Sequence, residues 1–375
     1  MTRLSKLFLF SAACLAVACD SGFERPSRVD SLRVFGVKPQ VRAVGEGDFS
    51  ELASGSPGAR VRLQLLGADG ARPAGDPLRP LQIAWFSGCH NPPTRQFYAC
   101  YPLLNALVSA MDRELVSPNN AAIPRDYFSV SANGDLSTVS AEAGTLFETN
   151  LPDDIVSSAP KSDRDPVHFG VSFSFFAACA GRLETRPQIH DHMPLACVDP
   201  DTGAELGIDD FVVGVATLFS YEGAQNQNPK LERLTFGGVD VDTPCQSDAD
   251  CALPSEAPMG LSRRCGESGV CVLKVPRCAE GQRCPEYLVE PKLAAESSEK
   301  LPGGDNEVIW ANFYANAGVF AVDTELLNDR ALGPVKAPGS YYATPRADVA
   351  AADIWLTVDD QRSGADFRHF RVEVE

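Results

Sequence analysis

Ten cysteines in the body of this 375-residue chain have the number and spacing for disulfide chemistry. Their even number, together with the export signal described below, favours an oxidising compartment and up to five disulfides. The last six form three pairs with five residues between partners, and spacing alone does not choose among the pairings that six cysteines permit. The ten residues are Cys89, Cys100, Cys179, Cys197, Cys245, Cys251, Cys265, Cys271, Cys278 and Cys284.

Structural zinc is the alternative chemistry for the last six cysteines, all of which lie within residues 243–285. Zinc ligands usually come in pairs separated by two to four residues, and this segment contains no histidine. Its apolar content is too low for a core, so crosslinks must take the place of one. We therefore expect a small disulfide-rich module at 243–285.

The stretch "QIHDHMP" is the best candidate for a transition-metal site. His190, Asp191 and His192 lie close together between Cys179 and Cys197, and two such histidines in one loop can share a metal. The alternative is a polar loop closed by a Cys179–Cys197 disulfide. We favour the loop.

Clustered aspartates raise the possibility of calcium, which needs six to eight oxygen ligands. The EF-hand spacing is absent, and a chain with 50 acidic residues brings aspartates together by chance. We expect no obligatory cofactor and keep calcium as the alternative. The clusters are Asp240, Asp242, Asp248 and Asp250 near the start of the cysteine-rich segment, and Asp359, Asp360 and Asp366 near the carboxyl end.

Catalytic motifs are absent from the sequence. It contains no G-x-S-x-G elbow, no Walker-type phosphate loop and no H-E-x-x-H zinc motif. None of the five histidines has an evident nucleophile partner, so we do not expect an enzyme. They are His90, His168, His190, His192 and His369.

Three tryptophans could stack on sugars. Trp85 alternates with Leu81 and Ile83 and is expected in the core, whereas Trp355 alternates with apolar neighbours and is a candidate for an outer face. For Trp310 and Trp355 we favour core or inter-domain packing over ligand stacking.

The amino terminus carries an export signal. Arg3 and Lys6 precede a twelve-residue apolar run, 7–18, which is too short for a transmembrane helix of roughly 20 residues. The small residues before Cys19 resemble a bacterial lipobox, in which the cysteine is acylated and becomes the first mature residue. Cys14 is a weaker competitor. The alternative is an ordinary cleaved signal followed by a stray cysteine.

Acylation of Cys19 predicts a permanent lipid anchor, with residues 19–30 as a polar tether. Removal of residues 1–18 leaves 31 basic and 50 acidic residues, a net charge near −19. This charge argues against nucleic acid as a partner and against electrostatic docking on anionic lipid. The remaining 357 residues fit two domains.

Alternation of apolar and polar residues predicts an all-β fold of two immunoglobulin-like antiparallel sandwiches. In "VHFGVSFSF" the odd-numbered residues from Val167 to Phe175 are apolar, and the intervening ones are small or polar. That pattern predicts a half-buried strand. Further strands are predicted at "RVRLQL", "LQIAW", "VVGVATLFSY", "LERLTF", "EVIWANFY", "DIWLTV" and "FRVEVE".

The expected organisation is a first sandwich at 31–230, with a helical insertion at 88–125, and a second at 231–375. One helix is predicted, in "YPLLNALVSAMDRELVSP", with Pro102 in its first turn and Pro118 at its end. Its apolar stripe is expected to pack on the first sandwich. Residues 292–307 are expected to form a linker or long loop.

Several segments together resemble predicted myxobacterial lipoproteins with immunoglobulin-like or PKD-like sandwich repeats. They include "IAWFSGCHNPP", an Asn-x-Asn-Pro turn at Asn226–Pro229, and a terminal hairpin at 359–364 in which Ser363 replaces a glycine. "CQSDADC" is similar to small cysteine modules of surface proteins from the same group. The resemblance implies the fold and a turn that joins two sandwiches, but no activity.

We therefore expect an exported lipoprotein of the cell envelope, anchored by Cys19 to the inner or outer membrane. Its expected role is non-catalytic and structural or adhesive, with an envelope protein or glycan as partner. The alternative is a ligand- or calcium-binding accessory module of an envelope complex. A hydrolase would need a cleft that joins a histidine to a carboxylate and a nucleophile.

Overall fold

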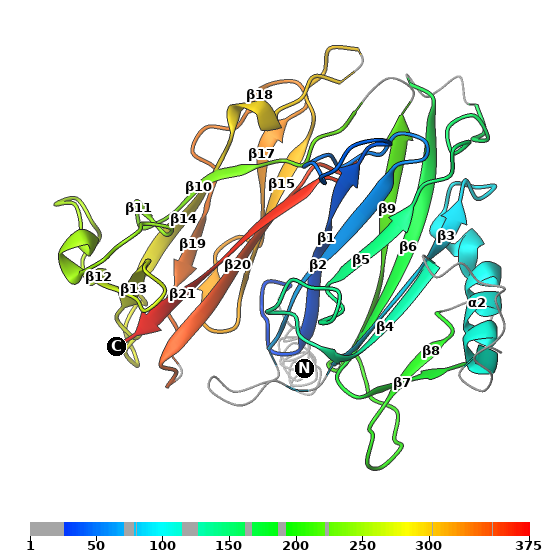
Figure 1. Cartoon of the computed structure of the whole chain (residues 1–375). Helices are drawn as coiled ribbons and strands as arrows, with labels where there is room; N and C mark the ends of the chain where they lie inside the picture. The colour runs from blue at the N-terminus through cyan, green and yellow to red at the C-terminus, as the bar shows by residue number, and fades with distance from the viewer. Residues whose placement is uncertain are drawn as a thin grey trace, which may run out of the picture.

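The computed structural model shows two antiparallel β-sandwiches lying side by side (Figure 1). The fold is therefore all-β; its described residues include one short α-helix and a small module that projects from the second sandwich. Within the described residues, no helix is long and apolar enough to cross a membrane. The structure describes residues 26–70, 79, 81–114, 127–161, 167–186, 193–221, 225–301, 303–346 and 348–375.

The first sandwich packs a three-stranded sheet, in the order β1-β2-β5, on a four-stranded sheet, in the order β4-β3-β6-β9. Trp85 is fully buried between them and stacks on Phe147 with ring centroids 5.5 Å apart. The strands are β1 (Leu32–Arg42), β2 (Arg60–Asp69), β3 (Leu81–His90), β4 (Phe128–Gly134), β5 (Leu146–Asn150), β6 (Phe169–Cys179) and β9 (Phe211–Tyr221).

The four-stranded sheet is covered on both faces, which corrects the prediction of a half-buried strand at β6. Its apolar row, Val171, Phe173 and Phe175, packs on the outer side with the helix α2 (Tyr101–Glu114). The alternate row includes Ser172 and Ser174, which are also fully buried. The Ser174 hydroxyl lies 3.0 Å from that of Ser87 and so satisfies its hydrogen-bonding capacity inside the protein.

The helix lies within the predicted insertion and packs on the sandwich as expected. It follows the 3₁₀ turn η1 (Phe97–Cys100) and buries Leu104 and Val108 against the sheet. A two-stranded hairpin, β7 (Arg182–Thr185) and β8 (Leu195–Val198), adds Leu195 to the same apolar cluster. The outer face is therefore a second core.

The second sandwich has a five-stranded sheet, in the order β11-β10-β14-β19-β16, and a seven-stranded sheet, in the order β12-β13-β21-β20-β15-β17-β18. Phe236, Phe313 and Tyr342 are buried between the sheets. The strands are β10 (Leu231–Phe236), β11 (Val239–Asp240), β12 (Ser262–Cys265), β13 (Cys271–Val275), β14 (Glu286–Leu293), β15 (Ile309–Ala315), β16 (Val319–Phe320), β17 (Thr324–Asp329), β18 (Gly333–Pro334), β19 (Ser340–Ala343), β20 (Ala351–Asp359) and β21 (Ala365–Val374).

The cysteine-rich segment is inserted between β11 and β14, and its hairpin β12–β13 extends the larger sheet. The strand β13 pairs with β21 in parallel, through Leu273 and Val372 among others. All other strand pairs of the described sheets are antiparallel. Lys292 and Leu293 of the predicted linker belong to β14 and pair with β10. From 294 to β15, the described residues form a long loop whose one helical element is the short turn η4 (Ala295–Ser297).

The chain reaches the second sandwich before it enters the first. The Ala315 amide donates to the Ser27 carbonyl, and the Val29 amide donates to the Ala315 carbonyl, both at 2.9 Å. Phe35 then stacks on Tyr314, with centroids 4.4 Å apart, from a bulge in β1 that turns its side chain toward the second sandwich. Both sandwiches are thus bound to the same short segment.

Candidate functional site

The ten candidate cysteines form five disulfides. The first two each fasten an addition to the four-stranded sheet: Cys89–Cys100 joins β3 to the start of the helix, and Cys179–Cys197 joins β6 to β8. The other three are Cys245–Cys265, Cys251–Cys271 and Cys278–Cys284. No cysteine of the described chain is left with a free thiol for nucleophilic or metal chemistry.

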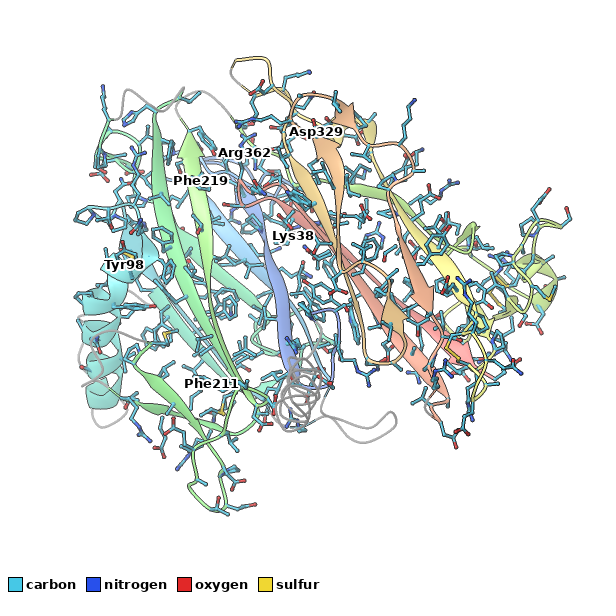
Figure 2. The ribbon with its side chains drawn as sticks, turned by 180° about the vertical axis from the view of Figure 1, so that it is seen from behind. Lys38, Tyr98, Phe211, Phe219, Asp329 and Arg362 are labelled. Atoms are coloured by element: carbon cyan, nitrogen blue, oxygen red, sulfur yellow. A yellow bond between two sulfur atoms is a disulfide. The ribbon has the colours of Figure 1, made fainter. Side chains whose placement is uncertain are left out.

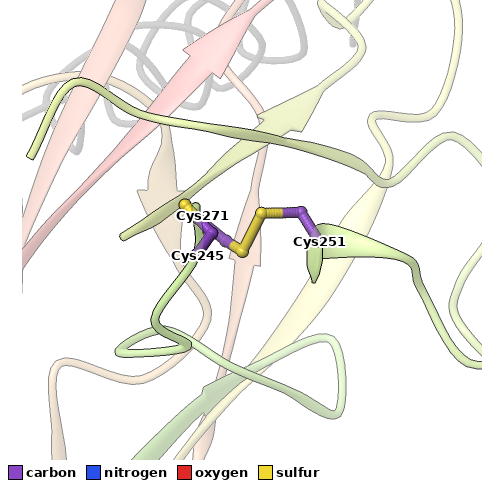
Figure 3. A group of neighbouring side chains, drawn as sticks. All are labelled: Cys245, Cys251 and Cys271. Atoms are coloured by element: carbon purple, nitrogen blue, oxygen red, sulfur yellow. A yellow bond between two sulfur atoms is a disulfide. The ribbon is translucent and has the colours of Figure 1, made fainter. Parts of the chain in front are cut away.

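The disulfides of the module cross each other, a pairing that spacing did not reveal. Cys245, Cys251 and Cys271 lie side by side (Figure 3), and their sulfur atoms are within 4.8 Å of one another. A zinc site would need these sulfurs as thiolates, whereas all three are oxidised here. The cluster is the small core of the module.

Cys19 and the pair His190 and His192 lie outside the described residues. The three described histidines have partners, and that of His168 is the Ala159 carbonyl oxygen, 3.2 Å from Nε2. His90 Nδ1 lies 3.1 Å from the hydroxyl of Ser172, which is fully buried, and burial lowers the pKa of His90. His369 Nε2 lies 3.0 Å from an Asp353 carboxylate oxygen. A hydrolase would need a hydroxyl and a carboxylate at the same histidine. Here the hydroxyl lies beside His90 in the first sandwich and the carboxylate beside His369 in the second.

The most densely bonded polar site lies at the seam between the sandwiches, where the Asn-x-Asn-Pro turn meets the β20–β21 hairpin. Asn226 is fully buried, and its amide nitrogen donates to Asp360 Oδ2 at 2.7 Å and to the Arg362 carbonyl at 3.1 Å. The other Asp360 oxygen accepts the amides of Arg362 and Gly364, each at 2.7 Å. The carboxylate thus holds the hairpin and the turn together.

Asn228 and Asp366 make the same connection a few residues further on. The Asn228 side chain donates to the Pro39 carbonyl at 2.6 Å and accepts the Ala365 amide at 2.9 Å. Asp366 accepts Lys38 Nζ at 3.0 Å and the Leu231 amide at 2.9 Å. Asn228 therefore joins the turn to β1 and β21, and Asp366 joins β1 to β10.

Arg362 completes this site with two ion pairs. Its guanidinium lies 2.8 Å from Glu307 and 3.4 Å from Glu299, and over the ring of Tyr221. Burial, reinforced by the Asp360 carboxylate, raises the pKa of Glu307 to about 8. Figure 2 shows Lys38 and Arg362 where the two sandwiches meet. We call this group the seam hub; it comprises Lys38, Asn226, Asn228, Glu307, Asp360, Arg362 and Asp366.

The aspartates considered for calcium are held by protein donors. Asp359 accepts the Asn312 side chain at 3.1 Å, and Asp360 and Asp366 belong to the hub. In the module, Asp250 accepts the amides of Gln246 and Ser247, and Asp248 accepts the amide of Cys265. Among the described residues, only the three clustered cysteines bring three metal-ligand atoms within 4.8 Å.

Trp355 lies on the outer face of the larger sheet of the second sandwich, against the first. It stacks on His369, with centroids 5.2 Å apart, and packs on Phe35 at 5.6 Å. Trp85 is in the core, as predicted. The aromatic side chain at the seam therefore contributes to packing between the sandwiches, the interpretation favoured from sequence.

Sequence reasoning identified part of the hub and missed the rest. The turn at Asn226–Pro229 and the hairpin at 359–364 were singled out by resemblance, but nothing indicated that one binds the other. Lys38 and Glu307 were missed because they lie in ordinary alternating strands or at a strand's edge. The only indication in the sequence is that each is a charged residue close to an apolar run.

No family model matches the chain, and no curated protein matches it.

Proposed function

We propose that this chain is an exported lipoprotein, anchored by Cys19 to a membrane of the cell envelope. In this proposal its two sandwiches are immunoglobulin-like, and together they serve as a rigid, non-catalytic structural or adhesive element. Its partner is an envelope protein or glycan. Nucleic acid is not a partner, because the chain carries a net charge of −17.

The observation that carries this proposal is the pairing of all ten cysteines that follow residue 19. Five disulfides require an oxidising compartment, which cytosolic proteins rarely encounter. Only Cys14 and Cys19 are left, and both belong to the segment with the features of an export signal. The ten described cysteines pair among themselves, so none of them needs Cys14 or Cys19 as a disulfide partner.

The hub supports the structural role. Its side chains are buried or half-buried, and they bond to both sandwiches and to the turn between them. Buried side chains that are hydrogen-bonded to several elements at once favour one geometry over others. A fixed angle between domains suits a protein that transmits position or load.

The intact mass of the detergent-extracted native protein tests the anchor. We expect a mass that begins at a triacylated Cys19 and that gains ten hydrogens on reduction. Cys19→Ala should move the protein from the membrane fraction to the soluble exported fraction, whereas the matched control Cys14→Ala should leave it with the membrane. An unlipidated mass, or membrane retention of Cys19→Ala, would overturn the proposal.

A further inference from the structure

A cavity of about 320 Å³ lies at the seam, away from the hub, and we call it the seam groove. One wall is the outward face of β20 and β21, and the other is formed by the end of β2 and the connection from β4 to β5. Clefts at domain interfaces with a few convergent polar groups are the usual place for small ligands, and this volume is at the lower end of their range.

Three cross-strand pairs line the wall of the second sandwich: Asp353 with Arg371, Trp355 with His369, and Thr357 with Phe367. All six side chains point the same way, because alternate residues of a strand share a face. Along β20, the groove therefore presents first the charged pair, then the pair of Trp355 and His369, and then the hydroxyl of Thr357 beside Phe367.

His369 is oriented by its neighbours. Asp353 accepts Asn316 Nδ2 at 3.2 Å, and its other oxygen lies 3.0 Å from His369 Nε2. Although burial opposes it, the hydrogen bond with His369 helps to lower the pKa of Asp353, so this carboxylate is an acceptor. The imidazole tautomer that donates to this carboxylate carries its proton on Nε2, which leaves Nδ1 as an acceptor.

Arg371 places a donor beside this acceptor. It lies two residues from His369 on the same face of β21 and is exposed. Within the described chain, Arg371 has no carboxylate within ion-pair distance, although Asp353 is its cross-strand neighbour. A ligand hydroxyl can accept from the guanidinium while its neighbour donates to the imidazole, because each hydroxyl does both.

The opposite wall limits the ligand's charge. Arg79 lies there in ion pairs with Asp69 at 2.6 Å and with Asp210 at 2.5 Å, so its charge is already balanced. Asp135 lies on the same rim. Because the lining carries carboxylates and guanidiniums in similar number, it does not select strongly for an anion or a cation.

Apolar groups complete the lining. Trp355 is half-buried, and Val139, across the groove, is 52% exposed. A sugar ring offers C–H groups to such surfaces and hydroxyls to the polar ones. We propose that the seam groove binds a neutral, hydroxyl-rich ring, a sugar residue of an envelope glycan, with His369 and Arg371 bonding its hydroxyls. The inference rests on the proposed function for the origin of that glycan.

The test uses saturation-transfer NMR and calorimetry on the full exported chain. The probes are the neutral disaccharides cellobiose and N,N′-diacetylchitobiose, with digalacturonate as an anionic control of similar size. We expect at least one neutral disaccharide to bind in the millimolar range and digalacturonate to bind more weakly. His369→Ala and Arg371→Ala should each weaken binding about tenfold, and His369→Gln, which restores an acceptor, should recover part of it.

Two further variants keep the test decisive. Ser137→Trp, on the rim, should fill the groove and abolish binding, whereas Arg283→Ala, on the exposed surface of the module, should bind as the wild type does. Far-ultraviolet circular dichroism checks that each variant is folded. Three results would overturn the inference: no neutral disaccharide binds, digalacturonate binds best, or Ser137→Trp binds normally. Each is distinguishable from failure of the lipid anchor, which the Cys19 measurements report independently.

Discussion

The disulfides of the two sandwiches hold different kinds of structure in place. In the first, Cys89–Cys100 and Cys179–Cys197 fasten a helix and a hairpin that also bury apolar side chains against the sheet. In the second, the crossed disulfides hold a module whose buried cluster consists of cysteines. The same bond therefore reinforces an apolar cluster in the first sandwich. In the module, Leu261, Leu273 and Val275 are buried in the core of the second sandwich, and the crossed disulfides hold the part of the segment that lies outside that core.

Truncation of a side chain in the core of the first sandwich should lower the stability of the protein most. Trp85→Ala deletes a fully buried indole that packs between the two sheets, and we expect a loss of about 3–5 kcal/mol in the free energy of unfolding. Phe97→Ala, at a residue 41% exposed on η1, is the matched control and should change stability little. Denaturant titration measures both, and a loss below about 1 kcal/mol for Trp85→Ala would contradict this account of the core.

The module should depend on its crosslinks more than the helix does. The double variant Cys251→Ser with Cys271→Ser opens a link of sequence separation 20, worth about 3 kcal/mol by loop entropy. We expect fast proteolysis within 243–285 while the sandwiches stay folded. Cys89→Ser with Cys100→Ser should leave the helix docked, because Leu104 and Val108 remain buried. Equal protease sensitivity in the two variants would show that the module does not depend on its disulfides more than the helix does.

The hub links the two regions without covalent bonds, and Asn226→Ala tests it. The substitution removes a donor from the buried Asp360 carboxylate, which should cost about 1–3 kcal/mol. Calorimetry should resolve the sandwiches into separate unfolding transitions that coincide in the wild type. Gln227→Ala, in the same turn but exposed, is the control. Coincident transitions in Asn226→Ala would show that the hub does not couple the sandwiches.

The last expected effect is a dependence of stability on pH. The pKa of Glu307 is raised to about 8 in the folded chain from an ordinary value of 4.5, so the folded state holds one proton more than the unfolded state between these values. This group's contribution is therefore greatest below pH 4.5 and is lost as the pH rises toward 8, by up to about 1.4 kcal/mol per pH unit.

Glu307→Gln should remove that slope, because glutamine does not titrate. Comparison of denaturation midpoints at several pH values, between wild type and variant, isolates the contribution of Glu307 from those of other carboxylates. Parallel curves for the two proteins would contradict a raised pKa. Glu296→Gln, at an exposed surface carboxylate, is a suitable control and should preserve the wild-type slope.

Period-two alternation was enough to predict the all-β class and the main strands, because each strand has at least one buried face. It failed at β6, where the small and polar row is buried too. Whether a second layer covers a sheet depends on distant segments, here α2 and the β7–β8 hairpin, and alternation within one strand contains no information about them.

The candidate sites, too, were predictable only in part. Cysteine spacing separated a module from the rest of the chain, but the partners Cys245–Cys265 and Cys251–Cys271 depend on how the hairpin folds. The aspartates at 359, 360 and 366 suggested a cation, yet protein donors satisfy them: the Asn312 side chain for Asp359, the turn and the hairpin amides for Asp360, and Lys38 with the Leu231 amide for Asp366. A carboxylate that caps backbone amides and one that binds calcium look alike in sequence, since both sit in turns.

The bridge between Ser27, Val29 and Ala315 has a mechanical consequence. A pull on the chain before residue 26 meets two hydrogen bonds to β15 of the second sandwich before it reaches β1 of the first. Tension is thereby divided between two folded bodies at the line where they join, and neither is peeled open from a free end. A protein fastened through its amino end would in this way resist shear as a single block.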